Sequence, residues 1–391
     1  MTQTAQTVLS PRGTVGVLPR PATLAEESDM TDTQLSPRGS IGVLPRPSTL
    51  ADESYTDFVE AFRDMALTRM FPVLFGAGDA ALAKAGIDPS HEVPLETVNA
   101  HFNRVPVAQT WQRFMRSAQE MMWRRTRASF AFDPAGHEAM LKAWETKGPG
   151  TLTYAPDFHV PDYARHEIHL QPGGYTDDAL GGIVYHYGTK VFYQGYNDQD
   201  ELHAEVVALS RLPTDGKVAH VLEIACGVGQ ATVKFKDRFP DAQVTGLDVA
   251  LPVLRYAHMR SAQLGSDVAY VQALAEAMPI ADASVDMVMS YIFFHETPVE
   301  VMRGVLAEVY RVLRPGGTFS IFEFPSHGAT PLPPAMRFMI DYDSRDNCEP
   351  YSVGFVYSDF RGILAEAGFE VSDGSKPMND FLQSVVATKK G

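Results

Sequence analysis

Short apolar runs alternate with amphipathic stretches along the second half of the chain. From residue 217 onward, runs of strand length are separated by stretches whose apolar residues recur every three or four positions, as on one face of a helix. Strands that alternate with helices form a parallel sheet with helices on both faces. The pattern predicts an α/β fold over residues 216–391, with a Rossmann-like, doubly wound and mostly parallel sheet of seven strands. The expected strands are 218–224, 243–247, 269–272, 285–291, 318–324, 368–371 and 381–388.

The chain before this domain has helical spacing. Aromatic residues and methionines between residues 55 and 150 recur every three or four positions, as in Phe58 and Phe62 or in Trp111, Phe114 and Met115. Such a stripe is typical of a helical core, and it also suits a cap that lines a substrate cavity. We therefore predict an N-terminal helical cap domain over residues 55–150.

A tandem repeat occupies the N-terminal 54 residues. The sequence of residues 9–28 reappears as residues 35–54 with four conservative changes. The prolines of each copy exclude a helix interior, and two copies are too few for a solenoid. We predict a disordered tail with a tandem Pro-Arg repeat over residues 1–54. The alternative is a pair of linear motifs that bind one partner bivalently.

Residues 151–215 are rich in tyrosine and histidine. Both side chains combine a flat apolar body with a polar group, which suits a wall facing a ligand of mixed polarity. We predict a connecting segment that lines the site, and the alternative is a hairpin packed on the next domain. The candidate substrate-lining residues are Tyr175, Tyr185, Tyr193, Tyr196 and Tyr291.

Composition narrows the class of protein. Two cysteines are too few for a disulfide scaffold or a thiolate zinc site, so we assign no metal ligands and expect a reducing, cytoplasmic location. The apolar runs are far shorter than the ~20 residues of a membrane span, and no secretion signal is present. The net charge of −15 argues against nucleic acid as a partner.

The strongest motif is Glu223-Ile-Ala-Cys-Gly-Val-Gly229, at the end of the first expected strand. Its glycines permit a tight turn and a close approach of backbone to a ligand, and Asp248 at the end of the second strand suits ribose hydroxyls. Thr232 stands where a dinucleotide site has its third glycine. Glu223 would repel a diphosphate and attract a sulfonium or ammonium group.

After Asp248 the chain continues with residues 275–279, Ser290 and residues 313–317, in this order. With this set of motifs it resembles the class I S-adenosylmethionine-dependent methyltransferases, in particular their UbiE-like small-molecule branch. The resemblance covers roughly residues 217–388 and implies S-adenosylmethionine as cofactor. It implies that the turn holds the methionine part, that Asp248 binds the ribose and that Val249 contacts the adenine. Leu274 replaces an acidic residue usual in the family, so backbone groups would meet the adenine amino group there. The implied cofactor contacts are Glu223, Ala225, Cys226, Gly227, Gly229, Asp248, Val249, Leu274, Ala275 and Ser290.

Candidate catalytic residues follow the fourth and fifth strands. His295 and Glu296 should border the methyl acceptor, because ligands bind beyond the carboxyl ends of parallel strands. His295 suits a general base, or alternatively a cap of the next helix with Glu296 at its positive end. Glu323 is a second catalytic candidate. The acidic residues near Glu349 are expected in a loop, either solvated or forming a lid that attracts a cationic acceptor or a metal.

The function that these features favour is transfer of a methyl group from S-adenosylmethionine to oxygen, nitrogen or sulfur of a small metabolite. The expected partner is the small-molecule acceptor, with no nucleic acid and no membrane, and a homodimer is left open. Two alternatives remain, an NAD(P)-dependent oxidoreductase and a non-catalytic cofactor-binding scaffold that the Pro-Arg tail recruits to a partner.

Overall fold

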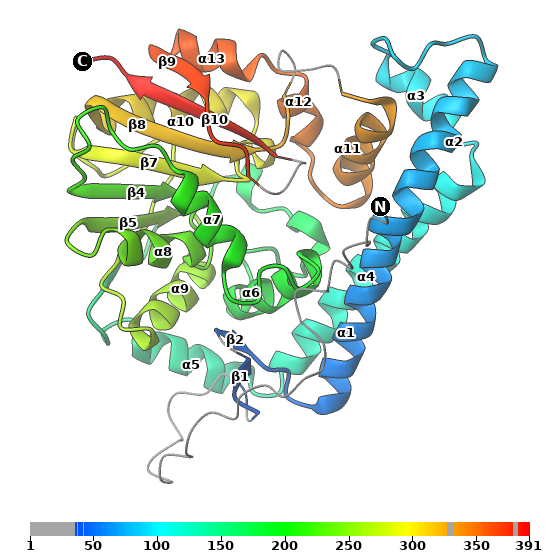
Figure 1. Ribbon diagram of the computed structural model, residues 1–391. Helices are drawn as coiled ribbons and strands as arrows, with labels where there is room; N and C mark the ends of the chain where they lie inside the picture. The colour runs from blue at the N-terminus through cyan, green and yellow to red at the C-terminus, as the bar shows by residue number, and fades with distance from the viewer. Residues whose placement is uncertain (1–35, 37, 42, 327–331, 378–381) are drawn as a thin grey trace, which may run out of the picture.

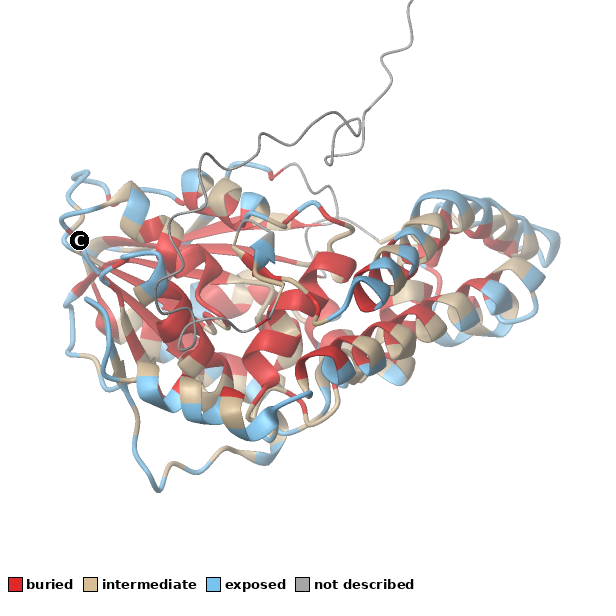
Figure 2. Ribbon diagram, turned by 90° about the horizontal axis from the view of Figure 1, so that it is seen from below, coloured by how far each residue is buried: buried red, intermediate tan, exposed pale blue. Residues whose placement is uncertain are grey.

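The computed structural model describes residues 36, 38–41, 43–326, 332–377 and 382–391. A twisted sheet with helices on its faces forms the body, and a set of long helices projects from it as an arm (Figure 1). Figure 2 shows that buried residues concentrate in the body and along the inner side of the arm. No helix in these ranges is both long enough and apolar enough to cross a bilayer.

The sheet has eight strands in the described chain, in the order β3-β6-β5-β4-β7-β8-β10-β9. Every neighbouring pair is parallel except the two pairs that β10 forms. The strands are β3 Thr151–Thr153, β4 His220–Ile224, β5 Gln243–Asp248, β6 Ala269–Gln272, β7 Val285–Tyr291, β8 Leu313–Glu323, β9 Phe369–Asp373 and β10 Gln383–Lys389.

The predicted fold class is confirmed, and the sheet gains one strand over the seven expected. The extra strand is β3, three residues long, which pairs with the edge strand β6 directly after Gly150. A three-residue strand has too few positions to show a two-residue period, so no pattern along the chain predicts it. The last expected strand began at residue 381, which lies outside the described residues.

Helices cover both faces of the sheet. The central strands β4 and β7 are almost wholly buried, as expected for parallel strands between two layers of helices. In α10, Met302, Val305, Leu306 and Val309 face the core at helical spacing. The helices of this domain are α8 Gln230–Arg238, α9 Leu251–Gln263, α10 Val299–Val312, α11 Pro334–Asp346, α12 Ser352–Val356 and α13 Phe360–Glu366.

The arm is built from the N-terminal helices and one helix of the later domain. Its core packs Trp111 against Phe71 and against Tyr342 of α11. The acidic segment expected as a loop before Glu349 is therefore largely the helix α11, because its apolar face has this partner. The N-terminal helices of the arm are α1 Leu50–Met65, a π-helical stretch Ala66–Met70, α2 Phe71–Lys84, α3 Leu95–Phe102 and α4 Pro106–Phe130. The next helix, α5 Pro134–Trp144, packs on α9 of the body instead (Figure 1).

The second copy of the repeat is folded, which corrects the tail expected up to residue 54. It contains the hairpin β1 Ser40–Ile41 and β2 Leu44–Pro45, and α1 begins within it. Leu44 is buried, and Arg46 pairs with Glu53 of α1 at 2.8 Å. The prolines exclude helix but not a short hairpin that packs on α6. The first copy, residues 9–28, lies outside the described residues.

The regular structure of the tyrosine-rich segment is helical apart from β3. After two short 3₁₀ turns, Asp162–Ala164 and Ile168–Leu170, it forms α6 Gly181–Phe192 and α7 Glu201–Leu209. Apart from β3, its described residues contain no strand, so the alternative of a hairpin was wrong. Lys190 of α6 reaches Asp57 and Glu60 of α1, both at 2.8 Å, so the segment is fixed to the arm.

Candidate active site

The glycine-rich turn joins the end of β4 to the start of α8. Its backbone is left-handed at Ala225, Gly227 and Gly229, with φ of 52°, 51° and 73°. Glycine adopts this conformation without steric cost, whereas Ala225 does so under strain. A side chain at Gly229 would begin 2.0 Å from the Tyr270 hydroxyl, so a larger residue does not fit. The turn therefore presents backbone rather than bulky side chains at the carboxyl end of the central strand.

Asp248 ties this turn to the neighbouring strand. Its carboxylate, at the end of β5, accepts hydrogen bonds from the backbone N–H groups of Gly227 and Ala250, each at 2.9 Å. Burial raises the pKa of Asp248, and these backbone hydrogen bonds oppose the rise. The two motifs that the sequence singled out thus meet at the sheet edge where open parallel sheets bind ligands.

Glu223 is buried at the end of β4, with 3% of its surface exposed. Its carboxyl accepts a hydrogen bond from the hydroxyl of Thr232, the residue that replaces a third glycine. Burial raises the pKa of Glu223 to about 8, the bond from Thr232 opposes that rise, and the charge of Asp248 adds to it. Near neutral pH the carboxyl is mostly protonated, and a cation held against the turn would favour its ionised form.

The candidate adenine contacts lie on the next pair of strands. Asp248 of β5 stands opposite Gln272 of β6, and the Gln272 side chain donates to the Val249 carbonyl at 3.0 Å. Leu274 and Ala275 follow directly after β6, and Ala275 is buried. Val249, Leu274 and Ala275 are therefore brought to the same edge as Asp248.

The end of β7 carries two further candidates. The Ser290 hydroxyl is buried, and no hydrogen bond to it exists within the described ranges. Tyr291 hydrogen-bonds to Tyr193, and the His203 ring lies 5.1 Å from the Tyr291 ring. Ser290 is thus free to bind a ligand at this strand end, whereas Tyr291 is held by its neighbours.

A wall of aromatic rings faces the turn. The Tyr175 and Tyr185 rings lie 5.0 Å apart, and Tyr185 would lie 3.8 Å from a side chain at Gly227. Tyr196, by contrast, is 48% exposed and does not belong to the wall. A small cavity opens among these rings, lined by Trp123, His169, Tyr175, Tyr185, Thr189, Phe192 and Tyr193.

Tyr185 lies close enough to several carboxylates for their charges to act on it. Burial raises the pKa of Tyr185 well above its usual value, and the charges of Asp248, Glu223 and Glu296 add to the rise after that of Tyr193. Asp248 and Glu223 belong to the glycine-rich turn, and Glu296 belongs to the loop after β7. Charges of the candidate cofactor side and of the candidate acceptor side thus act on the same ring.

Glu323 clamps the loop that follows β7. One of its oxygens accepts from the backbone N–H groups of Phe293 and Phe294, at 2.9 and 2.7 Å, and the other lies 2.8 Å from His295 Nδ1. Glu323 and His295 are both buried. The helix α10 begins after Pro298 without a side-chain cap, so His295 does not cap it. Glu323 therefore orients His295 and offers no free oxygen atom to an acceptor.

Glu296 faces three imidazoles. Its carboxylate lies 3.5 Å from His295, 3.8 Å from His169 and 3.9 Å from His166. Burial alone would raise the pKa of Glu296, but His166 and His295 lower it far below the usual value. Burial would lower the pKa of His295, yet the charges of Glu323 and Glu296 raise it well above the usual value. We therefore describe Glu296 as ionised and His295 as protonated.

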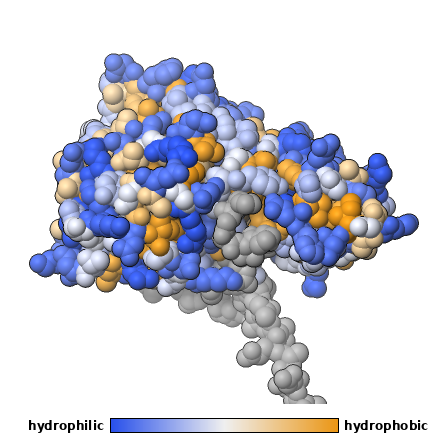
Figure 3. All heavy atoms as spheres, turned by 90° about the horizontal axis from the view of Figure 1, so that it is seen from above, coloured by the Kyte–Doolittle hydropathy of each residue, from blue (hydrophilic) through white to orange (hydrophobic). Residues whose placement is uncertain are grey.

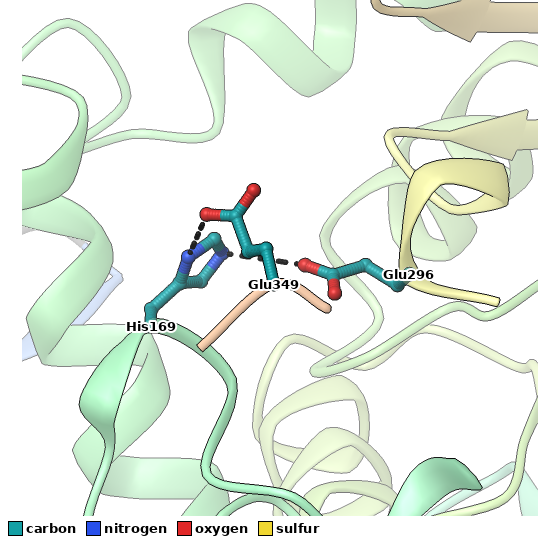
Figure 4. Close-up of side chains that lie close together, drawn as sticks. All are labelled: His169, Glu296 and Glu349. Carbon is teal, nitrogen blue, oxygen red and sulfur yellow. Dashed lines mark ion pairs between the residues drawn. The ribbon is translucent and has the colours of Figure 1, made fainter. Parts of the chain in front are cut away.

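His169 stands at the centre of this cluster. Figure 4 shows its ring between two carboxylates, with Nδ1 toward Glu349 and Nε2 toward Glu296. The Nδ1–Glu349 distance is 2.8 Å. The His169 carbonyl accepts from Trp123 Nε1 at 2.5 Å and from the Gln119 side chain at 2.8 Å. Helix α4 of the arm thus positions His169, a residue of the candidate site, through these two hydrogen bonds.

The sequence missed three members of the cluster as site residues. His166 and His169 entered only through the composition of their segment, and Glu349 only through an acidic stretch. The His-x-x-His spacing of residues 166–169 was the available signal. Glu349 could not be placed, because the helix α11 carries it back toward the arm.

These features define a class of protein: an α/β fold with a glycine-rich nucleotide-binding turn and a buried carboxylate on the adjacent strand. Residues 221–317 match the family model described as a methyltransferase domain. An uncharacterized methyltransferase of Synechocystis sp. is 31% identical over 153 residues, 39% of this chain and 66% of that protein. A solved structure, the PH0226 protein of Pyrococcus horikoshii, is 20% identical and covers 50% of this chain and 92% of its own, with a TM-score of 0.39.

A further relative settles the family. The malonyl-[acyl-carrier protein] O-methyltransferase of Enterobacter lignolyticus is 33% identical over 198 residues, 50% of this chain and 73% of that protein. The chain belongs to the S-adenosylmethionine-dependent methyltransferases, and S-adenosylmethionine is their cofactor. The chain spans only 66%, 47% and 32% of the lengths of three other curated methyltransferases that it matches.

Proposed function

We propose that the protein transfers a methyl group from S-adenosylmethionine to a small-molecule acceptor. The observation that carries the proposal is that Tyr185 lies against the glycine-rich turn at Gly227, where Asp248 is bound, and that the charge of Glu296 also raises its pKa. Methyl transfer needs an acceptor atom in line with the sulfonium, and correct placement alone supplies ~7–11 kcal/mol of the barrier. A wall between a cofactor turn and a buried acid–base cluster supports such placement.

We propose the following roles for the cofactor side. The turn at Ala225, Cys226, Gly227 and Gly229 holds the methionine part, with Glu223 countering its positive charge. Asp248 binds the ribose hydroxyls, as its place at the end of β5 allows. The adenine and the remaining edge of the cofactor lie against Val249, Leu274, Ala275 and Ser290.

On the acceptor side we propose that Glu296 takes the proton that the acceptor loses. An ionised carboxylate accepts a proton from a hydroxyl or amine as the methyl group leaves sulfur, which adds ~10²–10⁴-fold to the rate. Protonated His295 holds that carboxylate in place, and Glu323 positions His295. Tyr175, Tyr185 and Tyr193 enclose the acceptor.

The test compares ligands by titration calorimetry. We expect S-adenosylmethionine and S-adenosylhomocysteine to bind and NADH not to bind. Asp248→Asn should weaken cofactor binding by ~1.5–3 kcal/mol, the range for a hydrogen bond involving a charged group. Asp241→Asn, at an exposed aspartate just before β5, is the matched control and should bind as the native protein does. Tight NADH binding without a response to the sulfur nucleosides would instead support an oxidoreductase.

An acceptor screen tests the transfer itself. Labelled S-adenosylmethionine is incubated with pools of hydroxyl, amine and thiol metabolites, and products are identified by mass spectrometry. Loss of turnover in Glu296→Gln with unchanged cofactor affinity would support the proton role. Failure of every acceptor with a bound cofactor would favour the non-catalytic scaffold.

We also propose a setting for the enzyme. The net charge of −15 supports a metabolite rather than a nucleic acid as partner, and two free thiols, Cys226 and Cys348, support a cytoplasmic location. Figure 3 shows hydrophobic residues on the outer surface of the arm, where Phe58 and Val73 are more than half exposed. Such residues support a homodimer, which light scattering coupled to size-exclusion chromatography would test.

A further inference from the structure

Several buried polar atoms around Glu296 have no hydrogen-bond partner among the described residues. Glu296 Oε2, His166 Nε2 and His295 Nε2 are all buried without a hydrogen-bond partner among the described residues. His295 is only 1% exposed, so bulk water does not satisfy its nitrogen. Buried polar atoms of this kind are costly unless something binds them.

The separations in the cluster fit a bound ion better than direct hydrogen bonds. The imidazole nitrogens lie 3.5, 3.8 and 3.9 Å from Glu296, beyond the hydrogen-bond range. Ligand atoms that share one ion at ~2.0–2.2 Å lie about 3–3.5 Å from each other, so His169 Nε2 and Glu296 need to approach only slightly, whereas Glu349 has to move further to join them. His169, Glu296 and Glu349 each offer a ligand atom, and these atoms lie within 4.8 Å of one another.

We propose that His169, Glu296 and Glu349 bind one divalent transition-metal ion, with His166 Nε2 available as a fourth donor. The three ligands come from three separate segments, the 3₁₀ turn before α6, the loop after β7 and the turn after α11, and Figure 4 shows them converging. Imidazole with carboxylate suits Zn²⁺, Mn²⁺ or Fe²⁺, whereas Mg²⁺ prefers oxygen ligands alone.

The surroundings hold the ligands in place as metal sites require. Trp123 and Gln119 fix the backbone of His169 through its carbonyl. The Asn347 side chain donates to Glu349 Oε1 at 2.7 Å. Hydrogen bonds of this kind orient metal ligands, and their loss commonly lowers metal affinity 10–100-fold. The site therefore has supporting contacts on two of its three ligands.

The role of the ion rests on the proposed function, although its binding does not. The ion would bind the oxygen or nitrogen atom of an acceptor and lower the pKa of the proton on that atom. The second oxygen of Glu296, which has no hydrogen-bond partner among the described residues, would take this proton as the methyl group passes from the sulfonium to the acceptor atom.

The experiment measures Zn²⁺ binding by the full chain after treatment with a chelator. Calorimetry should show one tight Zn²⁺ site, and Co²⁺ in its place should give visible d–d absorption. His169→Ala and the isosteric Glu296→Gln should each lower Zn²⁺ affinity at least tenfold. His159→Ala, at an exposed histidine of the same segment, should leave it unchanged. A large excess of Mg²⁺ should not displace the Zn²⁺.

Folding and the proposed function are checked in the same samples. Circular dichroism and S-adenosylmethionine binding should be retained in Glu296→Gln, which shows that its loss of Zn²⁺ is local. Equal Zn²⁺ affinity in the native protein, Glu296→Gln and His159→Ala would overturn the metal site. One tight Zn²⁺ site in a protein that binds no S-adenosylmethionine would instead refute the proposed function and leave the metal site standing.

Discussion

Binding of S-adenosylmethionine should drive a proton off Glu223. In the free protein burial raises the pKa of this carboxyl to about 8, so near pH 7 it is mostly neutral. The sulfonium and ammonium groups of the cofactor carry positive charge, and a nearby positive charge favours the ionised carboxylate. The perturbation is therefore a change of pH, with Glu223→Gln as the variant that cannot titrate.

The number of protons released and the change in affinity follow from the pKa of Glu223. At about one pH unit below it, roughly nine-tenths of the carboxyl groups carry a proton, so binding to the ionised form releases roughly 0.9 proton. The apparent affinity should rise about tenfold between about pH 7 and pH 9, which corresponds to about 1.4 kcal/mol.

Calorimetry measures both the number of protons released and the affinity for the cofactor. Titrations in two buffers with different ionisation enthalpies give the number of protons released, and a pH series gives the slope of affinity. Glu223→Gln should release no proton at this site and show a flat profile. Glu366→Gln, at an exposed glutamate that pairs with Arg303, is the control and should keep the native profile.

Two results would refute the reasoning. The first is a pH slope in Glu223→Gln equal to that of the native protein, which would assign the titration to another group. The second is cofactor binding without proton release in the native protein. Either result would mean that the positive charge of the cofactor does not lie close to Glu223.

Three predictions concern stability and are measured by urea unfolding. Glu223→Gln should raise the free energy of unfolding at about pH 9 and change it little at about pH 5. The folded state keeps a proton on Glu223 that the unfolded state loses above about pH 4.5. The free energy of unfolding of the native protein therefore falls by up to about 1.4 kcal/mol per pH unit until about pH 8. Gly229→Ala should destabilise by ~1–3 kcal/mol, because its Cβ meets Tyr270 and its φ is positive. Leu44→Ala should lower the free energy of unfolding by ~2–5 kcal/mol, because Leu44 is buried in the hairpin of the second repeat. Leu50→Ala, at an exposed leucine, should lower it much less.

The sheet was predictable because its strands carry strong local signals. Central strands such as β4 and β7 are buried on both faces, so most of their positions are apolar. Turn residues then mark where each strand ends, as at Gly227 and Asp248. These turn residues led to the predicted cofactor side, and the structure brings the turn at Gly227 and Asp248 together as expected, while their contacts with the cofactor stay a prediction.

The acceptor side was only partly predictable, because tertiary packing decides it. His295 and Glu296 follow a strand, and that position alone placed them near the site. The helix α11 formed where an acidic loop was expected, because Tyr342 packs on Trp111 of the arm. Glu349 reaches the cluster only through that packing, and no local pattern encodes it.

The arm positions His169, one of the residues of the candidate acceptor side. His169 has a left-handed backbone, φ 55°, which is costly for a histidine and persists only where surrounding contacts impose it. Those contacts come from Trp123 and Gln119 of α4, and Arg63 of α1 in turn donates to Gln119 at 2.9 Å. The N-terminal helices therefore do more than cover the sheet, since they determine where one imidazole of the acceptor side stands. A methyltransferase domain separated from its arm would keep the glycine-rich turn and lose the contacts that position His169.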